Sequence, residues 1–198
     1  MKICVVKGEE MQKKVGFFVY DDFAIWQVSL LLKFLTDADY QIETLSINGG
    51  LVSTDGGVLV HTESIGHKNP NEYDFLLFPG GRVTKELVDN QHLKQFLQEF
   101  NGFIAASCAS SAIVAGAGLV KGDFTTMPPI KEIFSEYFTE GNYTDTDIVV
   151  GEKLITSKGS AHFEFMMAVL EKSGLMEEYP RLKNIALKLS RNQTLINK

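Results

Sequence analysis

The chain has 198 residues, of which 44% are hydrophobic and 22% are charged, and its formal net charge is -6. At roughly 100 to 200 residues per domain, this length predicts one globular domain over residues 1–198. The acidic balance and the scattered Lys and Arg residues argue against nucleic acid and anionic membranes as partners. The longest apolar runs are far shorter than the roughly 18 to 20 residues that cross a bilayer, so we expect no membrane partner.

The amino-terminal residues give no clear structural signal. For residues 1–12 we expect either an edge strand or a loose extension. Their apolar run is too short for a signal peptide and lacks a small-residue cleavage site, which predicts a cytoplasmic protein. The two cysteines, Cys4 and Cys108, are too few for a disulfide framework and lack metal-ligand spacing. We therefore expect reduced thiols, no metal and no cofactor.

Predicted strands and helices alternate along the chain, as hydrophobic periodicity and turn residues indicate. In the first half we predict a strand over Val15 to Tyr20, a helix over Ile25 to Leu35, a strand over Gln41 to Ile47, a hairpin over Leu51 to Thr62 turning at residues 54–57, and a strand over Phe75 to Phe78. In the second half we predict a helix over Thr84 to Phe100 capped by Thr84, a strand over Phe103 to Ala106, a helix over Ser107 to Leu119, a helix from Pro128 to Phe138, strands over Ile148 to Val150 and Leu154 to Thr156, a helix over Ala161 to Lys172 and a last helix after Pro180.

This alternation predicts an α/β fold with a mostly parallel sheet and helices on both faces. Such sheets bind ligands beyond the carboxyl ends of their strands. Three loops follow core strands there, at residues 20–23, 79–82 and 107–111. We expect these loops to converge on one site.

Cys108 occupies the most informative of these loops. Residues 104–112 lead a buried strand into a helix, with small residues on both sides of Cys108. This pattern is typical of a nucleophile elbow, where a sharp turn projects a reactive side chain. The N–H groups at a helix start would favour the thiolate and lower the pKa of the thiol. The alternative is a buried structural cysteine, and that alternative is the interpretation we favour for Cys4.

The turn at Pro79-Gly80-Gly81 places backbone N–H groups near the predicted elbow. Together with the N–H of Ala109, those of Gly80 and Gly81 could hold a developing oxyanion. Alone, the tripeptide would be a simple turn that ends a strand.

Four segments in the correct order carry a resemblance to a known family: Tyr20 to Gln27, Asp74 to Gly81, Ala105 to Ala109 and Leu154 to Phe165. Together they resemble the ThiJ/PfpI family of the class I glutamine amidotransferase-like superfamily. The resemblance implies a flavodoxin-like three-layer sandwich, often a homodimer, with a cysteine at the elbow. Reported activities in the family include peptidase, chaperone, glyoxalase, deglycase and isocyanide hydratase, so membership narrows function only loosely.

The chain departs from the family pattern at the expected proton-transfer partners. Gln27 stands where the family usually has a glutamate that lies against the cysteine. An amide can donate a hydrogen bond to a thiolate but cannot act as a general acid or base. Ala109 and Met127 stand where some members have histidines.

His162 is the best remaining substitute for a base, because its loop matches a segment that borders the pocket in relatives. The alternative is a solvated histidine at a helix start. We interpret Glu164 as a first-turn carboxylate that the helix dipole favours. Asp21 and Asp22 border the predicted mouth, where they would cap the following helix or contact a ligand, capping being the more frequent role.

Two functional hypotheses follow. The first is a cysteine-dependent hydrolase, amidase, glyoxalase or hydratase in which Cys108 attacks a small electrophilic substrate. The second is a non-catalytic oxidation sensor or stress-related binding protein, in which Gln27 stabilises an oxidised Cys108. A glutamine amidotransferase proper is disfavoured, because no downstream His-x-Glu pair completes a triad.

Overall fold

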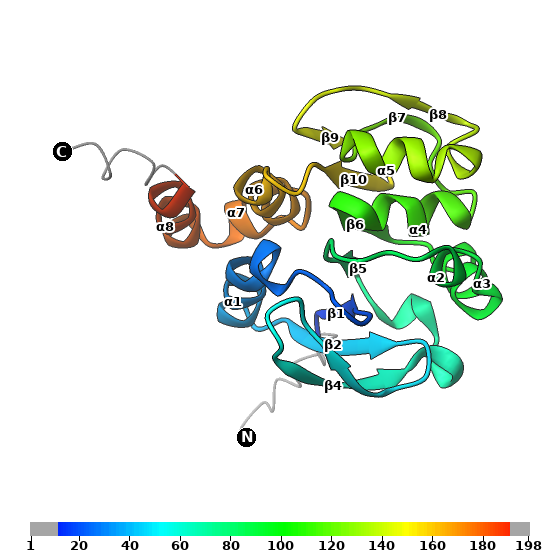
Figure 1. Ribbon diagram of the computed structural model, residues 1–198. Helices are drawn as coiled ribbons and strands as arrows, with labels where there is room; N and C mark the ends of the chain where they lie inside the picture. The colour runs from blue at the N-terminus through cyan, green and yellow to red at the C-terminus, as the bar shows by residue number, and fades with distance from the viewer. Residues whose placement is uncertain (1–11, 191–198) are drawn as a thin grey trace, which may run out of the picture.

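The computed structural model describes residues 12–190 and contains a central sheet between two layers of helices (Figure 1). The sheet consists of β1 (Lys14–Phe18), β2 (Gln41–Ser46), β3 (Gly50–Ser53), β4 (Leu59–Ser64), β5 (Phe75–Phe78), β6 (Phe103–Ser107), β9 (Ile148–Val150) and β10 (Leu154–Ser157). These strands lie in the order β3-β4-β2-β1-β5-β6-β10-β9. A separate parallel pair is formed by β7 (Gly122–Phe124) and β8 (Gly141–Tyr143).

The strands from β4 to β10 in this order run parallel, and the edge strands β3 and β9 are antiparallel to their neighbours. All four residues of β5 are buried apolar side chains. A strand in the middle of a parallel sheet is covered on both faces, which explains why its sequence is a continuous hydrophobic run.

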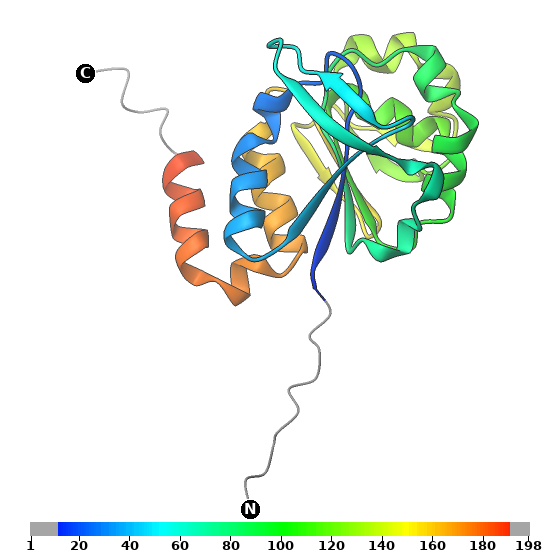
Figure 2. The same cartoon turned by 90° about the horizontal axis from the view of Figure 1, so that it is seen from below.

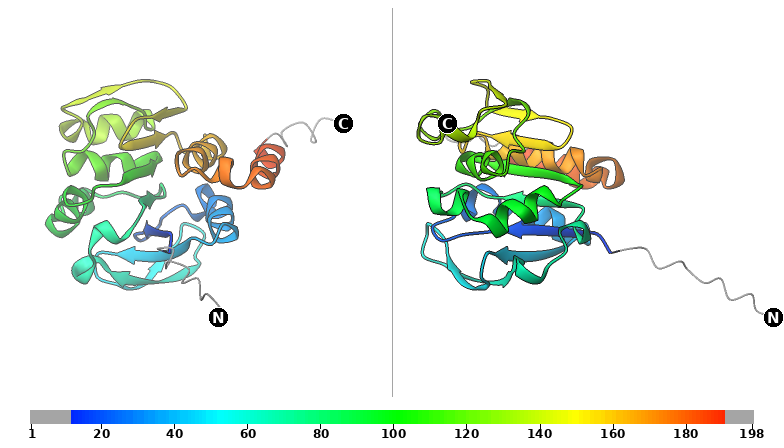
Figure 3. Two further views of the ribbon diagram at one scale, coloured as in Figure 1. Left: turned by 180° about the vertical axis from the view of Figure 1, so that it is seen from behind. Right: turned by 90° about the vertical axis from the view of Figure 1, so that its right-hand side faces the viewer.

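Helices cover both faces of the sheet (Figure 2). One layer contains α1 (Ser29–Asp37), α6 (His162–Lys172) and α7 (Leu175–Glu178), with α8 (Pro180–Ser190) on its outer side, and the other contains α2 (Lys85–Val88), α3 (Gln91–Gln98), α4 (Ser111–Gly116) and α5 (Pro128–Ile133). Short 3-10 turns occur at η1 (Ile25–Gln27), η2 (Ile65–His67), η3 (Pro70–Glu72), η4 (Cys108–Ser110) and η5 (Ser135–Tyr137). The views from behind and from the side show the same three layers (Figure 3). The predicted α/β flavodoxin-like sandwich is confirmed.

The helix predicted over Thr84 to Phe100 is wrong as a single element. The Thr84 side chain accepts a hydrogen bond from Leu87 N–H at 3.2 Å and caps α2, as predicted. Asn90 then accepts one from Leu93 N–H at 3.0 Å and caps a second helix, α3. Asn side chains compete with the helix backbone for hydrogen bonds, so the residue that we placed inside a helix starts a new one.

Other boundaries also differ from the prediction. The segment after β6 begins as the 3-10 turn η4, and α4 ends at Gly116. The short elements β7, β8 and α7 were not predicted. The prediction for residues 1–12 lies outside the described residues except for Gln12. Within residues 12–190, no helix has the length and apolar character needed to cross a bilayer.

Candidate active site

The site lies at the carboxyl ends of four neighbouring strands, β1, β5, β6 and β10. The segment after each strand supplies one residue: Gln27 follows β1, Gly80 follows β5, Cys108 follows β6 and Gly159 follows β10. Parallel strands end at the same edge of a sheet, so segments far apart in sequence meet there. The predicted convergence of the loops is therefore what the fold shows.

Cys108 has a strained backbone. Its φ angle is +55°, in the left-handed region that a residue with a Cβ avoids at a cost of about 1–2 kcal/mol. Ser111 Oγ and Thr126 Oγ1 both donate hydrogen bonds to the Cys108 carbonyl, at 3.0 and 2.9 Å. These bonds hold the peptide in place. The turn therefore has the geometry of a nucleophile elbow, in which the side chain points away from the strand end.

Gln27 is 5% exposed, and its amide is held in one orientation. Its Oε1 accepts hydrogen bonds from Gly80 N–H at 2.9 Å and from Ser107 Oγ at 3.0 Å. Ser157 Oγ donates in turn to Ser107 Oγ at 3.2 Å. Because a backbone N–H can only donate, the atom facing Gly80 must be the amide oxygen. The amide nitrogen Nε2 is thereby directed to Cys108, whose sulfur it hydrogen-bonds.

The Cys108 sulfur is surrounded by N–H donors, and the residue is partly buried. Burial raises the pKa of the Cys108 thiol, and hydrogen bonds from Ala109 N–H, Gln27 and Gly159 N–H offset only part of that effect. The expected lowering of this pKa is wrong. Desolvation disfavours the charged thiolate more strongly than neutral donors favour it, and α4 has only six residues and starts after η4.

The glycine turn after β5 has a different role from the one expected. Gly80 N–H is bound to Gln27, so it holds the amide rather than an oxyanion. Gly81 has a φ of +138°, and a Cβ built there would lie 2.5 Å from Asp22 O. This glycine therefore lets the turn pack against the loop after β1. Of the three predicted backbone donors, only Ala109 N–H reaches the sulfur.

Gly159 is a site residue that the sequence prediction missed. Its N–H donates to the Cys108 sulfur. A Cβ built on Gly159 would lie 2.9 Å from Gln27 Nε2 and 3.0 Å from Cys108 Sγ. The glycine thus allows the close approach of backbone, amide and thiol. The available signal was a glycine three residues after a predicted strand, inside a segment that carried the family resemblance.

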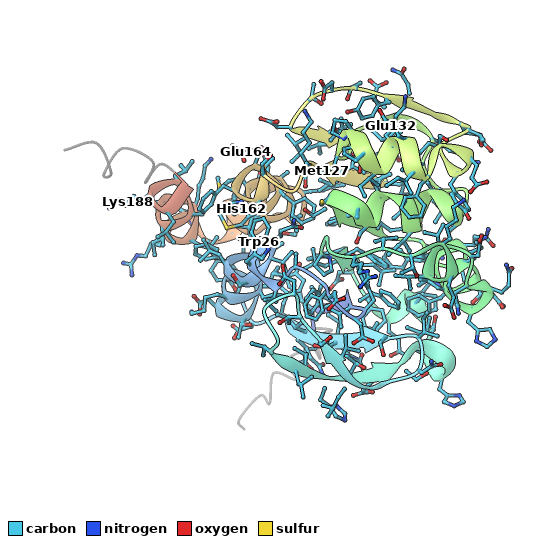
Figure 4. All side chains as sticks on the ribbon, viewed as in Figure 1. Trp26, Met127, Glu132, His162, Glu164 and Lys188 are labelled. Carbon is cyan, nitrogen blue, oxygen red and sulfur yellow. The ribbon has the colours of Figure 1, made fainter. Side chains whose placement is uncertain are left out.

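His162 is the first residue of α6 and makes aromatic contacts. Its ring lies 5.5 Å from that of Trp26, edge to face, and 4.3 Å from that of Phe163. Within the described residues, His162 Nδ1 is the one buried side-chain nitrogen or oxygen without a hydrogen-bond partner. No hydrogen bond in the described structure joins His162 to Cys108. Figure 4 shows His162 beside Trp26.

The other histidines lie away from the cysteine. His61 is exposed in β4, His67 in η2 and His92 in α3. Met127 is partly buried and immediately follows Thr126, which binds the Cys108 carbonyl, so it lies close to the elbow along the chain. In the described part of the chain, no group of three or more His, Cys, Asp or Glu residues is arranged to hold a metal ion.

The acidic residues near the mouth have structural contacts. Asp21 accepts hydrogen bonds from the backbone N–H and hydroxyl of Ser53, at 3.0 and 3.2 Å, and so binds the β3–β4 hairpin. Asp22 pairs with Arg82 at 3.6 Å. The expected capping of the next helix is wrong, because η1 and α1 have no side-chain cap. Glu164 lies exposed in the first turn of α6, as predicted for a carboxylate that the helix dipole favours.

The fold and site define an α/β protein with a cysteine on a strained strand-to-turn junction. The sequence matches the DJ-1/PfpI family over residues 13–172. The chain belongs to this family, which confirms the resemblance found in the sequence.

Curated relatives carry differing functional names. A Bacillus subtilis protein named as an uncharacterised protease, YdeA, is 26% identical over 165 residues, covering 80% of this chain and 82% of the relative. The Caenorhabditis elegans protein named glutathione-independent glyoxalase DJR-1.2 is 29% identical, covering 50% and 54%. An uncharacterised Methanocaldococcus jannaschii protein is 32% identical, and the match spans 56% of each chain.

Solved structures of low sequence identity share the fold. Schizosaccharomyces pombe DJ-1 superposes with a TM-score of 0.73 at 22% identity, over 86% of this chain and 97% of that one. Drosophila melanogaster DJ-1beta gives a TM-score of 0.74 at 20% identity, over 90% and 97%.

Proposed function

We propose that the protein is a cysteine-dependent enzyme whose nucleophile, Cys108, attacks a small electrophilic carbonyl compound. The observation that carries this proposal is the strained φ of +55° at Cys108 together with the Gln27 amide held against its sulfur. Backbone strain of this kind persists only when its surroundings enforce it, and it is concentrated at functional sites.

An aldehyde is the electrophile that suits this site best. When a thiol adds to an aldehyde, the sulfur–carbon bond forms, the carbonyl π electrons move to oxygen, and the thiol proton ends on that oxygen. No leaving group has to be protonated, so this step depends less on a general acid than amide hydrolysis does. Ala109 N–H and Gly159 N–H lie beside the sulfur, where they can donate to the developing oxyanion. A relative named as a glyoxalase supports this choice.

The test is consumption of methylglyoxal by the purified wild type and by Cys108→Ser. The wild type should consume the ketoaldehyde and the variant should lose that activity, since a hydroxyl is a much weaker nucleophile at neutral pH. If the two proteins react at equal rates, Cys108 is not the nucleophile. If neither protein shows activity against a panel of ketoaldehydes, amides and isocyanides, the catalytic proposal is wrong.

A second candidate is an oxidation sensor. Gln27 is a neutral donor directed at the sulfur, and such a donor can stabilise a sulfinate without repelling it. Peptide mass spectrometry after mild peroxide should then find sulfenic or sulfinic acid at Cys108. Oxidation confined to Cys4 would contradict this role.

Homodimerisation remains a proposal. Apolar Leu51, Val58 and Leu59 are exposed on the β3–β4 hairpin at one edge of the sheet, and surfaces of this kind mark interaction sites. Light scattering should give twice the chain mass, and the mass of a single chain would count against a dimer.

A further inference from the structure

Trp26 is the single tryptophan of the chain, and half of its side chain, 51%, is exposed. Two contacts fix its ring. The indole Nε1 donates to Asp55 Oδ2 at 3.0 Å in the turn of the β3–β4 hairpin, and the ring meets that of His162 at 5.5 Å. A large aromatic surface is therefore open to solvent yet already ordered, which lowers the entropic cost of binding a partner.

The Trp26–His162 pair is carried by two segments that also contact the reactive sulfur. Trp26 directly precedes Gln27, whose amide contacts the Cys108 sulfur. His162 follows three residues after Gly159, whose N–H contacts the same sulfur. The two segments that touch the sulfur are thus the two that carry the rings. Figure 4 shows Trp26 and His162 together where η1 meets the start of α6.

His162 takes part in this arrangement as an aromatic ring rather than as a base. Its side chain makes no hydrogen bond in the described part of the chain, and its Nδ1 is buried without a partner. Its ring is placed by contact with Trp26 and Phe163. A general base needs a hydrogen-bonding path to the proton that it moves, and neither nitrogen of His162 has one to Cys108.

We propose that the Trp26–His162 pair is a subsite for a flat aromatic group, so that electrophiles carrying such a group react faster at Cys108 than aliphatic ones of similar size. This proposal rests on the proposed function in that it assigns a substrate class to the same site. Aromatic rings in offset or edge-to-face contact gain about 0.5–1.5 kcal/mol beyond the burial of their area, and Trp26 offers such a contact.

The experiment compares two maleimides of similar size, N-phenylmaleimide and N-cyclohexylmaleimide, in a Cys4→Ser background where Cys108 is the remaining cysteine. The thiol adds across the maleimide double bond, its proton passes to the neighbouring carbon, and no turnover is required. The ratio of the two rates is divided by the same ratio for glutathione, which removes the intrinsic difference in reactivity. We expect a preference for the phenyl compound of about fivefold, the size that one aromatic contact provides.

Variants at the subsite give the control. Trp26→Leu should bring the ratio to that of glutathione, and its urea unfolding should stay close to that of wild type, since an exposed side chain contributes little to folding. Trp26→Phe should retain most of the preference, and Asp55→Ala, which frees the indole, should reduce it. A preference that persists in Trp26→Leu would overturn the subsite.

The remaining outcomes separate this proposal from the proposed function. A phenyl preference without methylglyoxal turnover supports the subsite and counts against the catalytic proposal. Turnover without a phenyl preference overturns the subsite alone. If the preference is absent and Trp26 fluorescence instead changes with protein concentration, a second copy covers the ring, and the subsite is also overturned.

Discussion

The side-chain amide of Gln27 presents its nitrogen to the sulfur of Cys108, because its oxygen is already bound by Gly80 N–H and the Ser107 hydroxyl. A glutamate at this position would place one oxygen in the same two bonds and the other against the sulfur. That second oxygen could donate only when protonated. The amide therefore gives a permanent donor and removes a proton carrier, which suits addition to an aldehyde better than acid–base chemistry.

Gln27→Glu should make the Cys108 thiol less reactive. An ionised carboxylate beside the thiol disfavours the thiolate, and like charges at this range shift a pKa by about 1–3 units. Alkylation of Cys108 by iodoacetamide at pH 7.5 should therefore slow by about tenfold or more. Unchanged alkylation would show that residue 27 does not affect the thiol.

Gln27→Leu should destabilise the protein. It leaves the buried Gly80 N–H and Ser107 hydroxyl without their acceptor, and each such group costs about 1–3 kcal/mol. We expect a loss of about 3 kcal/mol in urea unfolding. Gln95→Ala is the matched control, since the Gln95 side chain is exposed and binds only Glu99 among the described residues, and the variant should stay within about 0.5 kcal/mol of wild type. Equal stabilities for the two variants would contradict the buried network.

The reactivity of Cys108 should rise with pH later than that of an ordinary thiol. Burial raises its pKa, so at neutral pH a smaller fraction is thiolate than for a free cysteine with a pKa of about 8.5. The rate of iodoacetamide labelling, followed on the Cys108 peptide, should therefore reach half its maximum above pH 8.5, with glutathione as the reference. If Cys108 labelling reaches half its maximum at a lower pH than glutathione labelling does, the thiol has the lowered pKa that the sequence predicted.

The sequence was sufficient for the architecture because the core strands carry continuous apolar runs. The four buried residues of β5 were predicted with their observed bounds, and Cys108 was correctly placed at a strand-to-helix turn. Short elements were missed. Three-residue strands such as β7 have too few side chains to show a hydrophobic periodicity. The residues around Asn90 form the same sequence pattern whether Asn90 lies inside a helix or starts one.

Site details depended on contacts between distant segments. No pattern in the sequence shows that Gly80 N–H binds Gln27, since 53 positions separate them. The sign of the Cys108 pKa shift was also out of reach, because it depends on how much water reaches the sulfur. Helix-start reasoning counts only the favourable donors and omits desolvation.

Gly159→Ala should impair Cys108 without unfolding the chain. The added methyl would lie 2.9 Å from Gln27 Nε2 and 3.0 Å from Cys108 Sγ, so one of these groups must move. We expect loss of most methylglyoxal consumption and a destabilisation of about 1–3 kcal/mol from overpacking. Gly56→Ala is the control, because its methyl would meet only Thr54 Oγ1 at 3.8 Å. Full activity in Gly159→Ala would show that this approach is not needed.

Substitutions of Cys108 measure the cost of its backbone strain independently of the reactivity of its thiol. At a φ of +55° glycine has no Cβ penalty, so Cys108→Gly should be more stable than Cys108→Ala by about 1 kcal/mol in thermal or urea unfolding. Both variants lose the thiol, so burial of sulfur does not affect the comparison. The opposite order is expected inside α4, where Ala112→Gly should cost about 1 kcal/mol. If Cys108→Ala is as stable as Cys108→Gly, the turn relaxes when the sulfur is absent, and the left-handed backbone is then maintained by the thiol's contacts with Gln27 and Gly159 rather than by Ser111 and Thr126.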